Sequence, residues 1–182
     1  GYAGNIGAKQ KLHALIDTAA TFAERDDRVQ FAIAGDGAHR SALEASVAAS
    51  RLTNVRLLPL QRGREYSAFL NGVDLSYIAQ ADGVSDAFIP SKLYPTLASG
   101  CAVACFANER AELYGLMRES GAALTYTWAE TDRFVSRVLD LAEDRSELQA
   151  MGAAARDFAL ARFTEESALA EFVCAVEGGN GV

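Results

Sequence analysis

The sequence is short of cysteine, proline and positive charge, and each shortage excludes a class of protein. Its 182 residues include three cysteines and three prolines, and 17 basic residues against 24 acidic ones give a formal net charge of −7. Cys101, Cys105 and Cys174 show neither CxxC spacing nor adjacent histidines, so we expect no disulfide framework or zinc site but small core residues of a reduced protein. The scattered lysines and arginines form no basic stripe, so nucleic acid is not expected as a partner.

Long apolar runs are missing as well. No stretch approaches the roughly 18 apolar residues of a membrane-spanning helix, and the first residues lack the features of a secretory signal. Half of the residues are nevertheless hydrophobic, which is enough for one well-packed domain at this length. We therefore expect a single globular domain in the cytoplasm.

Short apolar runs alternate with segments of helical period, the pattern of βαβ units. Leu12, Leu15, Ile16 and Ala19, for example, share one helical face, so each crossover is predicted to be a helix. The fold class is therefore α/β, with a Rossmann-like, doubly wound parallel sheet of about six strands and extra C-terminal helices. The predicted strands are a first strand at Tyr2-Ala3 and residues 29–34, 55–58, 74–79, 102–106 and 122–126, and the C-terminal helices are residues 130–143, 145–162 and 165–176.

The first strand is represented only by its end. A core strand needs about five paired residues, and natural chains rarely begin inside one. We therefore expect residues 1–182 to be one domain of a longer polypeptide that has lost an N-terminal domain. The last helical stretch is expected to be loosely held, with exposed apolar side chains among Ala168, Leu169, Phe172 and Val173, because it would reach toward that missing partner.

Ligands of a parallel sheet bind at the carboxyl ends of its strands, so the strand-to-helix turns are the candidate sites. In the first turn, Gly4-Asn5-Ile6-Gly7 precedes Lys9 and a predicted helix, a combination that could cradle a phosphate. A glycine-rich turn with a solvated lysine is an equal alternative.

The second turn, Gly35-Asp36-Gly37, differs from a dinucleotide fingerprint. Arg40 stands where a third glycine is needed, and no acidic residue follows about 20 positions later. A nicotinamide cofactor is therefore not expected, and a tight turn into a helix is the favoured interpretation.

Two further turns carry candidate residues. Pro59 and Leu60 follow a predicted strand and could line a nucleobase pocket, although a plain loop would look the same. Ser91 is predicted to cap a helix at which Lys92 adds positive charge for a diphosphate. The alternative for Pro90-Ser91-Lys92 is an ordinary capped helix with an exposed lysine.

Together with Leu97-Ala98-Ser99-Gly100, these ordered motifs resemble the C-terminal domain of retaining GT-B glycosyltransferases, particularly those of exopolysaccharide and colanic-acid synthesis. The resemblance implies a nucleotide-sugar donor bound here and a saccharide or lipid-linked acceptor bound to the missing N-terminal domain. No metal or other cofactor is expected, and the full-length protein is expected in the cytoplasm, either free or peripheral at the inner face of the membrane. The implied diphosphate ligands are Gly4, Asn5, Gly7, Lys9, Ser91 and Lys92, and the implied base contacts are Pro59 and Leu60.

The sequence departs from this family in two places. Many relatives carry two glutamates separated by seven residues, where this chain has Ala87 and Pro95. Asp82 and Asp86 could replace them as ribose or sugar contacts, or could simply be solvated loop residues. The usual Lys-Gly pair is replaced by Gln10-Lys11. No catalytic residue is identified, and a catalytically inactive nucleotide-binding or scaffolding module remains the alternative function.

Overall fold

The computed structural model describes residues 1–26, 28–167 and 169, in which strands and helices alternate along the chain. The six strands are β1 (Tyr2–Asn5), β2 (Phe31–Asp36), β3 (Val55–Leu58), β4 (Leu75–Ala79), β5 (Ala102–Phe106) and β6 (Ala123–Tyr126). The helices are α1 (Leu12–Arg25), α2 (Arg40–Ala49), α3 (Gly63–Gly72), α4 (Leu93–Ala98), α5 (Glu112–Ser120), α6 (Thr131–Glu143) and α7 (Ser146–Arg162), with short 3-10 helices η1 (Ala8–Gln10) and η2 (Trp128–Glu130).

The strands form two three-stranded halves in which every pairing is parallel. One half has the order β1-β2-β3 and the other β4-β5-β6. The halves meet at β1 and β4, where the nitrogen of Gly1 donates to the Leu75 carbonyl and the Tyr77 N–H donates to the Gly1 carbonyl, both at 2.7 Å. The strands therefore follow the Rossmann order 3-2-1-4-5-6. The strands themselves are parallel, but successive strands are added on the other side of the sheet after β3, so the order reverses between β1 and β4. The expected set of six parallel strands is confirmed.

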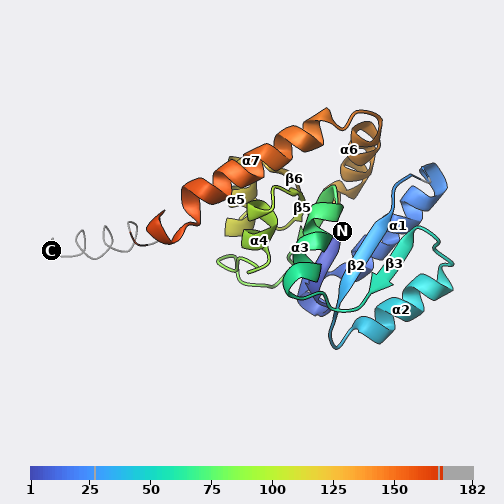
Figure 1. Ribbon diagram of the computed structural model, residues 1–182. Helices are drawn as coiled ribbons and strands as arrows, with labels where there is room; N and C mark the ends of the chain where they lie inside the picture. Colours follow the sequence, from blue (N-terminus) through green and yellow to red (C-terminus); the bar gives the residue numbers. More distant parts are fainter. Residues whose placement is uncertain (27, 168, 170–182) are drawn as a thin grey trace.

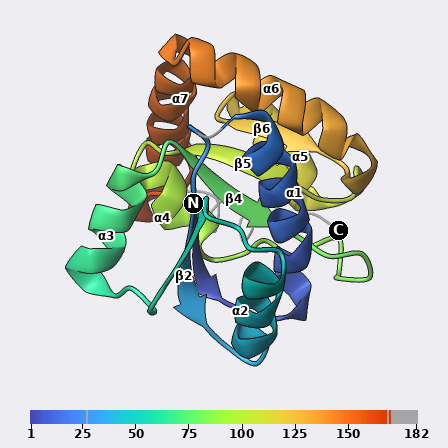
Figure 2. The ribbon, with the colours of Figure 1, turned by 90° about the vertical axis from the view of Figure 1, so that its right-hand side faces the viewer.

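Helices cover both faces of the sheet because alternate strand residues point to opposite sides. Tyr77 and Ala79 pack in a cluster with α1 and α6, whereas Ile78, between them, packs in a second cluster with α4, α5 and α7. Figure 1 shows α1 and α2 beside β2 and β3, and α4 and α5 beside β5 and β6, with α7 running across the domain. In Figure 2, α3 and α4 lie on one side of the strands and α1 lies on the other.

The end of the chain tests the sequence expectations only in part. Leu169 is 57% exposed, as expected for the last helical stretch, whereas Ala168, Phe172 and Val173 lie outside the described residues.

Cys101 and Cys105 are buried free thiols, as predicted, and Cys174 lies outside the described part. Among the described helices, none has the length and apolar character needed to span a membrane.

Candidate functional site

The fold brings the first and fourth candidate turns together at the reversal point of the strand order. Gly4 lies at the carboxyl end of β1, and a Cβ atom placed on it would lie 4.0 Å from Nζ of Lys92, which comes from the loop after β4. The Ala81 N–H also donates to the Lys9 carbonyl at 2.9 Å, which joins the two turns. The reversal point is where open α/β sheets bind their ligands, so two segments far apart in sequence form one candidate site.

Lys92 is the most unusual side chain of this site. Its Nζ is buried and, within the described part of the chain, finds no hydrogen-bond partner. The ammonium instead lies over the ring of Tyr2, 3.7 Å from the ring centroid, and this cation–π contact offsets part of the cost of burial. Burial lowers the pKa of Lys92 from 10.5 to about 7. A buried cation without a counter-charge is a feature that a bound anion would satisfy.

The turn after β1 differs from the expected cradle in where its helix begins. Lys9 belongs to the one-turn helix η1, and α1 begins only at Leu12, after Lys11 adopts a left-handed conformation with φ 48°. The Gly7 N–H donates to the side-chain oxygen of Gln10 at 3.2 Å. Lys9 is exposed, with its Nζ 5.7 Å from the Phe88 ring centroid. The helix predicted to follow this turn is therefore present and begins at Leu12, and Lys9 precedes it within η1.

The prediction that Ser91 caps the helix after β4 is wrong. Helix α4 begins at Leu93, its N-cap residue is Lys92, and no side chain caps it. The Leu93 N–H donates to the Pro90 carbonyl at 2.9 Å, so a turn over Pro90 to Leu93 precedes the helix. Ser91 sits in this turn and is exposed, and the helix itself is only six residues long.

Gly35 lies in strand β2, and the predicted tight turn into helix α2 begins only at Gly37, whose carbonyl accepts the Arg40 N–H at 3.0 Å. A Cβ atom on Gly35 would overlap the carbonyl oxygen of Gly4. Gly37 has φ 150°, and a Cβ there would lie 2.7 Å from the side-chain oxygen of Asn5. The Ile6 N–H donates to the Asp36 carbonyl at 2.8 Å. Only glycine permits this close approach, which holds the turn after β1 in place.

Asp82 and Asp86 differ in their surroundings. Asp82 forms an ion pair with Lys11 at 3.0 Å, and the Lys11 ammonium lies 4.1 Å from the centroid of the Trp128 ring. To contact a ribose or a sugar, Asp82 would therefore have to give up or share its ion pair with Lys11. The Asp86 side chain is exposed, while its backbone carbonyl accepts the Glu112 N–H at 2.8 Å.

Pro59 and Leu60 follow β3 at the same edge of the sheet and are exposed. The Pro59 carbonyl accepts a hydrogen bond from the side-chain amide of Gln61 at 2.9 Å. The last carbonyl of β3, that of Leu58, accepts one from the Arg40 guanidinium at 2.8 Å. The loop is thus tethered at its start, and the Leu60 side chain is 39% exposed.

Comparison with known proteins identifies the architecture. No family model matches the sequence. Over 99 residues, the chain is 38% identical to the putative colanic acid biosynthesis glycosyl transferase WcaI of Escherichia coli, covering 54% of this chain and 24% of that protein. The C-terminal domain of LpcC, a glycosyl transferase group 1 family protein from Francisella tularensis, superposes with a TM-score of 0.70 at 13% identity, covering 91% of this chain and 85% of that one. This chain has the fold of a GT-B glycosyltransferase C-terminal domain.

The structure of a larger protein also matches this chain in fold. TarM from S. aureus, as a mutant in complex with UDP and two other ligands, superposes with a TM-score of 0.79 at 16% identity, covering 94% of this chain and 34% of that one. The chain thus spans about a quarter of WcaI and about a third of TarM. The match to WcaI is one of sequence, whereas the matches to LpcC and TarM, at 13% and 16% identity, are matches of fold.

Sequence analysis missed two residues at the carboxyl edge of the sheet. Gln80 follows β4 directly, is 4% exposed and donates from its side chain to the Ser85 carbonyl at 2.7 Å. Trp128 follows β6, donates to the Gln80 carbonyl at 3.1 Å and packs under Lys11. Both occupy the carboxyl ends of strands, so the rule that located the other turns would also have found them.

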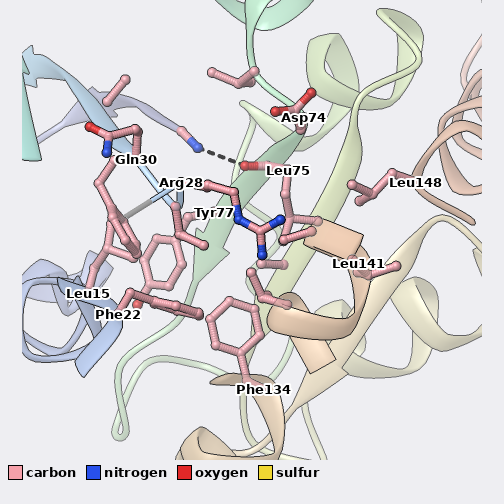
Figure 3. A pocket seen from close by; sticks show the side chains of 18 of the residues that line it. Leu15, Phe22, Arg28, Gln30, Asp74, Leu75, Tyr77, Phe134, Leu141 and Leu148 are labelled. Atoms are coloured by element: carbon pink, nitrogen blue, oxygen red, sulfur yellow. Dashed lines mark hydrogen bonds between the residues drawn. The ribbon is translucent and has the colours of Figure 1, made fainter. Parts of the chain in front are cut away.

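A separate cleft of about 630 Å³ lies at the amino ends of the strands, opposite the candidate site (Figure 3). Its lining comes from residues at the amino ends of strands, such as Phe31 and Leu75, and from apolar side chains of α1 and α6 that include Phe22 and Phe134. Arg28 at this cleft is paired with Asp26 and Glu143. None of the predicted site residues lines the cleft. Among the described residues, no three histidine, cysteine or acidic side chains gather as a metal site would require.

Proposed function

We propose that this chain is the donor-binding half of a group 1 glycosyltransferase. It would bind the nucleoside diphosphate of a sugar donor at the carboxyl edge between β1 and β4. The single observation that carries the proposal is the buried, unpartnered ammonium of Lys92 beside Gly4 at the reversal point of the strand order. The fold and the sequence similarity to a glycosyl transferase support it.

In this proposal the diphosphate lies against the turn of Gly4, Asn5 and Gly7 and is contacted by Lys92, with Lys9 and Ser91 at the exposed rim. Sugar transfer makes the nucleoside diphosphate the leaving group, whose negative charge grows as the glycosidic bond breaks. A fixed cation in a site shielded from water stabilises that charge more than a solvated one does. Charge stabilisation of this kind requires no metal ion.

The base is proposed to contact Pro59 and Leu60, with Asp82 or Asp86 toward the ribose or the sugar. TarM was crystallised with UDP, so UDP is the first nucleotide to test. The whole protein is proposed to carry a second, N-terminal domain for a saccharide or lipid-linked acceptor, to transfer with retention of configuration, and to work in the cytoplasm, free or at the inner face of the membrane.

Calorimetric titration with UDP and with uridine tests the diphosphate site. A charge-assisted contact contributes about 1.5–3 kcal/mol, so Lys92→Ala should weaken UDP binding about tenfold or more. Lys9→Ala is the matched control and should cost less, because Lys9 is exposed. Neither variant should change uridine binding. If Lys92→Ala binds UDP as tightly as the parent, the diphosphate does not lie at this lysine.

Ala87 and Pro95 favour a second candidate function, a nucleotide-binding or scaffolding module without transferase activity. Ala87 is exposed in the loop before α4, and Pro95 lies within α4, so neither supplies a carboxylate. Residues 1–182 alone should bind nucleotide but transfer no sugar, because a transferase must hold donor and acceptor together. Transfer by the full-length protein supports the enzyme, whereas nucleotide binding without transfer supports the module.

A further inference from the structure

Strand β2 continues past the end of its neighbour β3. The last residue pair between them is Ala34 with Leu58, whereas Gly35 and Asp36 of β2 pair only with Gly4 and Asn5 of β1. Strand β3 ends at Leu58, directly before the loop that starts at Pro59. Alternate residues of β2 face β3, as the hydrogen bond from the Phe31 N–H to the Asn54 carbonyl shows. The Gly35 carbonyl faces β3 beyond the last residue pair, where the strand no longer supplies a donor.

Arg40 joins the two strands where their pairing ends. Its guanidinium Nη1 donates to the carbonyls of both Gly35 and Leu58, the latter at 2.8 Å, and its Nε donates to Glu44 at 2.8 Å. The side chain is only 24% exposed. A lysine at this position has a side chain one atom shorter and no equivalent of Nε for Glu44, so it does not reproduce this set of contacts.

We propose that Arg40 is a positioning residue for the recognition of the nucleobase. By holding the Leu58 carbonyl, it fixes the point at which the Pro59-Leu60 loop leaves the sheet. This inference rests on the proposed function, which assigns the base to that loop. Arg40 itself is given no contact with the nucleotide.

The position of Arg40 in the sheet predicts that its loss affects the base more than the diphosphate. The turn after β1 is held independently, by the pairing of Gly4 with Gly35 and by the hydrogen bond from Ile6 to Asp36. On the β3 side, Nη1 of Arg40 joins the last carbonyl of β3 to the Gly35 carbonyl of β2, at the point where the loop starts. A loosened loop would therefore lose base contacts while the diphosphate site keeps its shape.

The test compares a nucleoside diphosphate with inorganic pyrophosphate. The tightest-binding of UDP, GDP, ADP and dTDP is first chosen with the parent domain, and Arg40→Lys is then titrated with that nucleotide and with pyrophosphate. Arg40→Lys keeps the charge but not the length of the side chain or the Nε contact with Glu44. It should weaken nucleotide binding by roughly five- to tenfold while pyrophosphate binding changes less than about twofold. The control Glu44→Gln leaves both carbonyl contacts in place and should match the parent for both ligands.

The remaining outcomes separate this inference from the proposed function. An equal loss for nucleotide and pyrophosphate, or no loss for either, overturns the role of Arg40 in base positioning. If thermal melting shows that Arg40→Lys does not fold, Gln61→Ala tests the same loop from its exposed side, where the same selective loss of roughly two- to threefold is expected and unchanged binding overturns the inference. A parent domain that binds no nucleoside diphosphate overturns the proposed function itself.

Discussion

Raising the pH through neutrality should weaken donor binding through Lys92. In the free domain, burial places the pKa of this lysine at about 7, so the ammonium form is replaced by the neutral amine as the pH rises above that value. A bound diphosphate favours the ammonium form and raises the pKa of Lys92. Binding above pH 7 therefore takes up a proton, and by linkage the affinity must fall as the pH rises.

The size of this effect follows from the strength of the contact. A charge-assisted contact of about 1.5–3 kcal/mol corresponds to roughly 10- to 150-fold in affinity. At pH 6 the lysine of the free domain is already charged, and the full contact is available. At pH 9 about 99% of the free domain carries the neutral amine, and affinity should be roughly 10- to 50-fold lower than at pH 6, because part of the contact energy is spent on protonation.

Calorimetry with a nucleotide sugar measures this dependence best. Both phosphates of a nucleotide sugar are esterified, so its charge stays constant, whereas the terminal phosphate of UDP titrates near pH 6 as phosphate monoesters do. Titrations at pH 8 in two buffers of different ionisation enthalpy should show uptake of roughly half a proton or more. The Lys92→Ala variant retains His13 and His39, so any pH dependence due to the histidines would remain in it. The reasoning fails if parent affinity is flat from pH 6 to 9, or if Lys92→Ala shows the same slope.

Two further predictions concern stability. Lys92→Met removes the buried amine but keeps an apolar stem against Tyr2, so thermal melting at pH 6 should show about 1–3 kcal/mol of added stability. Because the pKa of Lys92 is lower in the folded protein than in the unfolded chain, this gain should shrink as the pH rises from 7 toward 10.5. An unchanged or lower melting temperature at pH 6 contradicts the prediction. Gly35→Ala should lower the free energy of unfolding by roughly 2–4 kcal/mol, because its Cβ would overlap the Gly4 carbonyl. The control Gly115→Ala in α5, where nothing lies within 4 Å of the added Cβ, should raise the free energy of unfolding by about 0.5–1 kcal/mol. Equal melting temperatures for the two variants would refute the packing role of Gly35.

Apolar runs with clear boundaries could be located from sequence, and one strand shows the limit of that approach. β3 and β5 have the predicted bounds, and β3 ends directly before Pro59. β2 was predicted at residues 29–34 but is Phe31–Asp36. Gly35 and Asp36 have the local character of a turn, yet they pair with Gly4 and Asn5. The pairing comes from a distant strand, so no local pattern reveals it.

The candidate site was predictable as a set of turns but not as a set of contacts. Lys92 is buried because Tyr2, from the first strand, lies beneath its ammonium, and the sequence near Lys92 contains no sign of that ring. Lys11 adopts a left-handed conformation at φ 48°. Its side chain pairs with Asp82 across the site. No local pattern reveals this ion pair, because it forms only when the turns after β1 and β4 come together.

A buried, unpartnered lysine is costly for a folded domain, and this cost is informative about its role. Exposed lysines such as Lys9 keep their hydration and contribute little to holding an anion, because water screens them. Lys92 has lost that hydration on folding, and within the described residues it has found only the face of Tyr2 in exchange. An anion that binds beside Lys92 meets a cation that has already lost its water. Less of the attraction is therefore cancelled by desolvation than at an exposed lysine. Lys92→Met should therefore make the domain more stable and at the same time a weaker binder of diphosphate. Such a loss of binding for a gain of stability is expected where a site is organised for its ligand before the ligand binds.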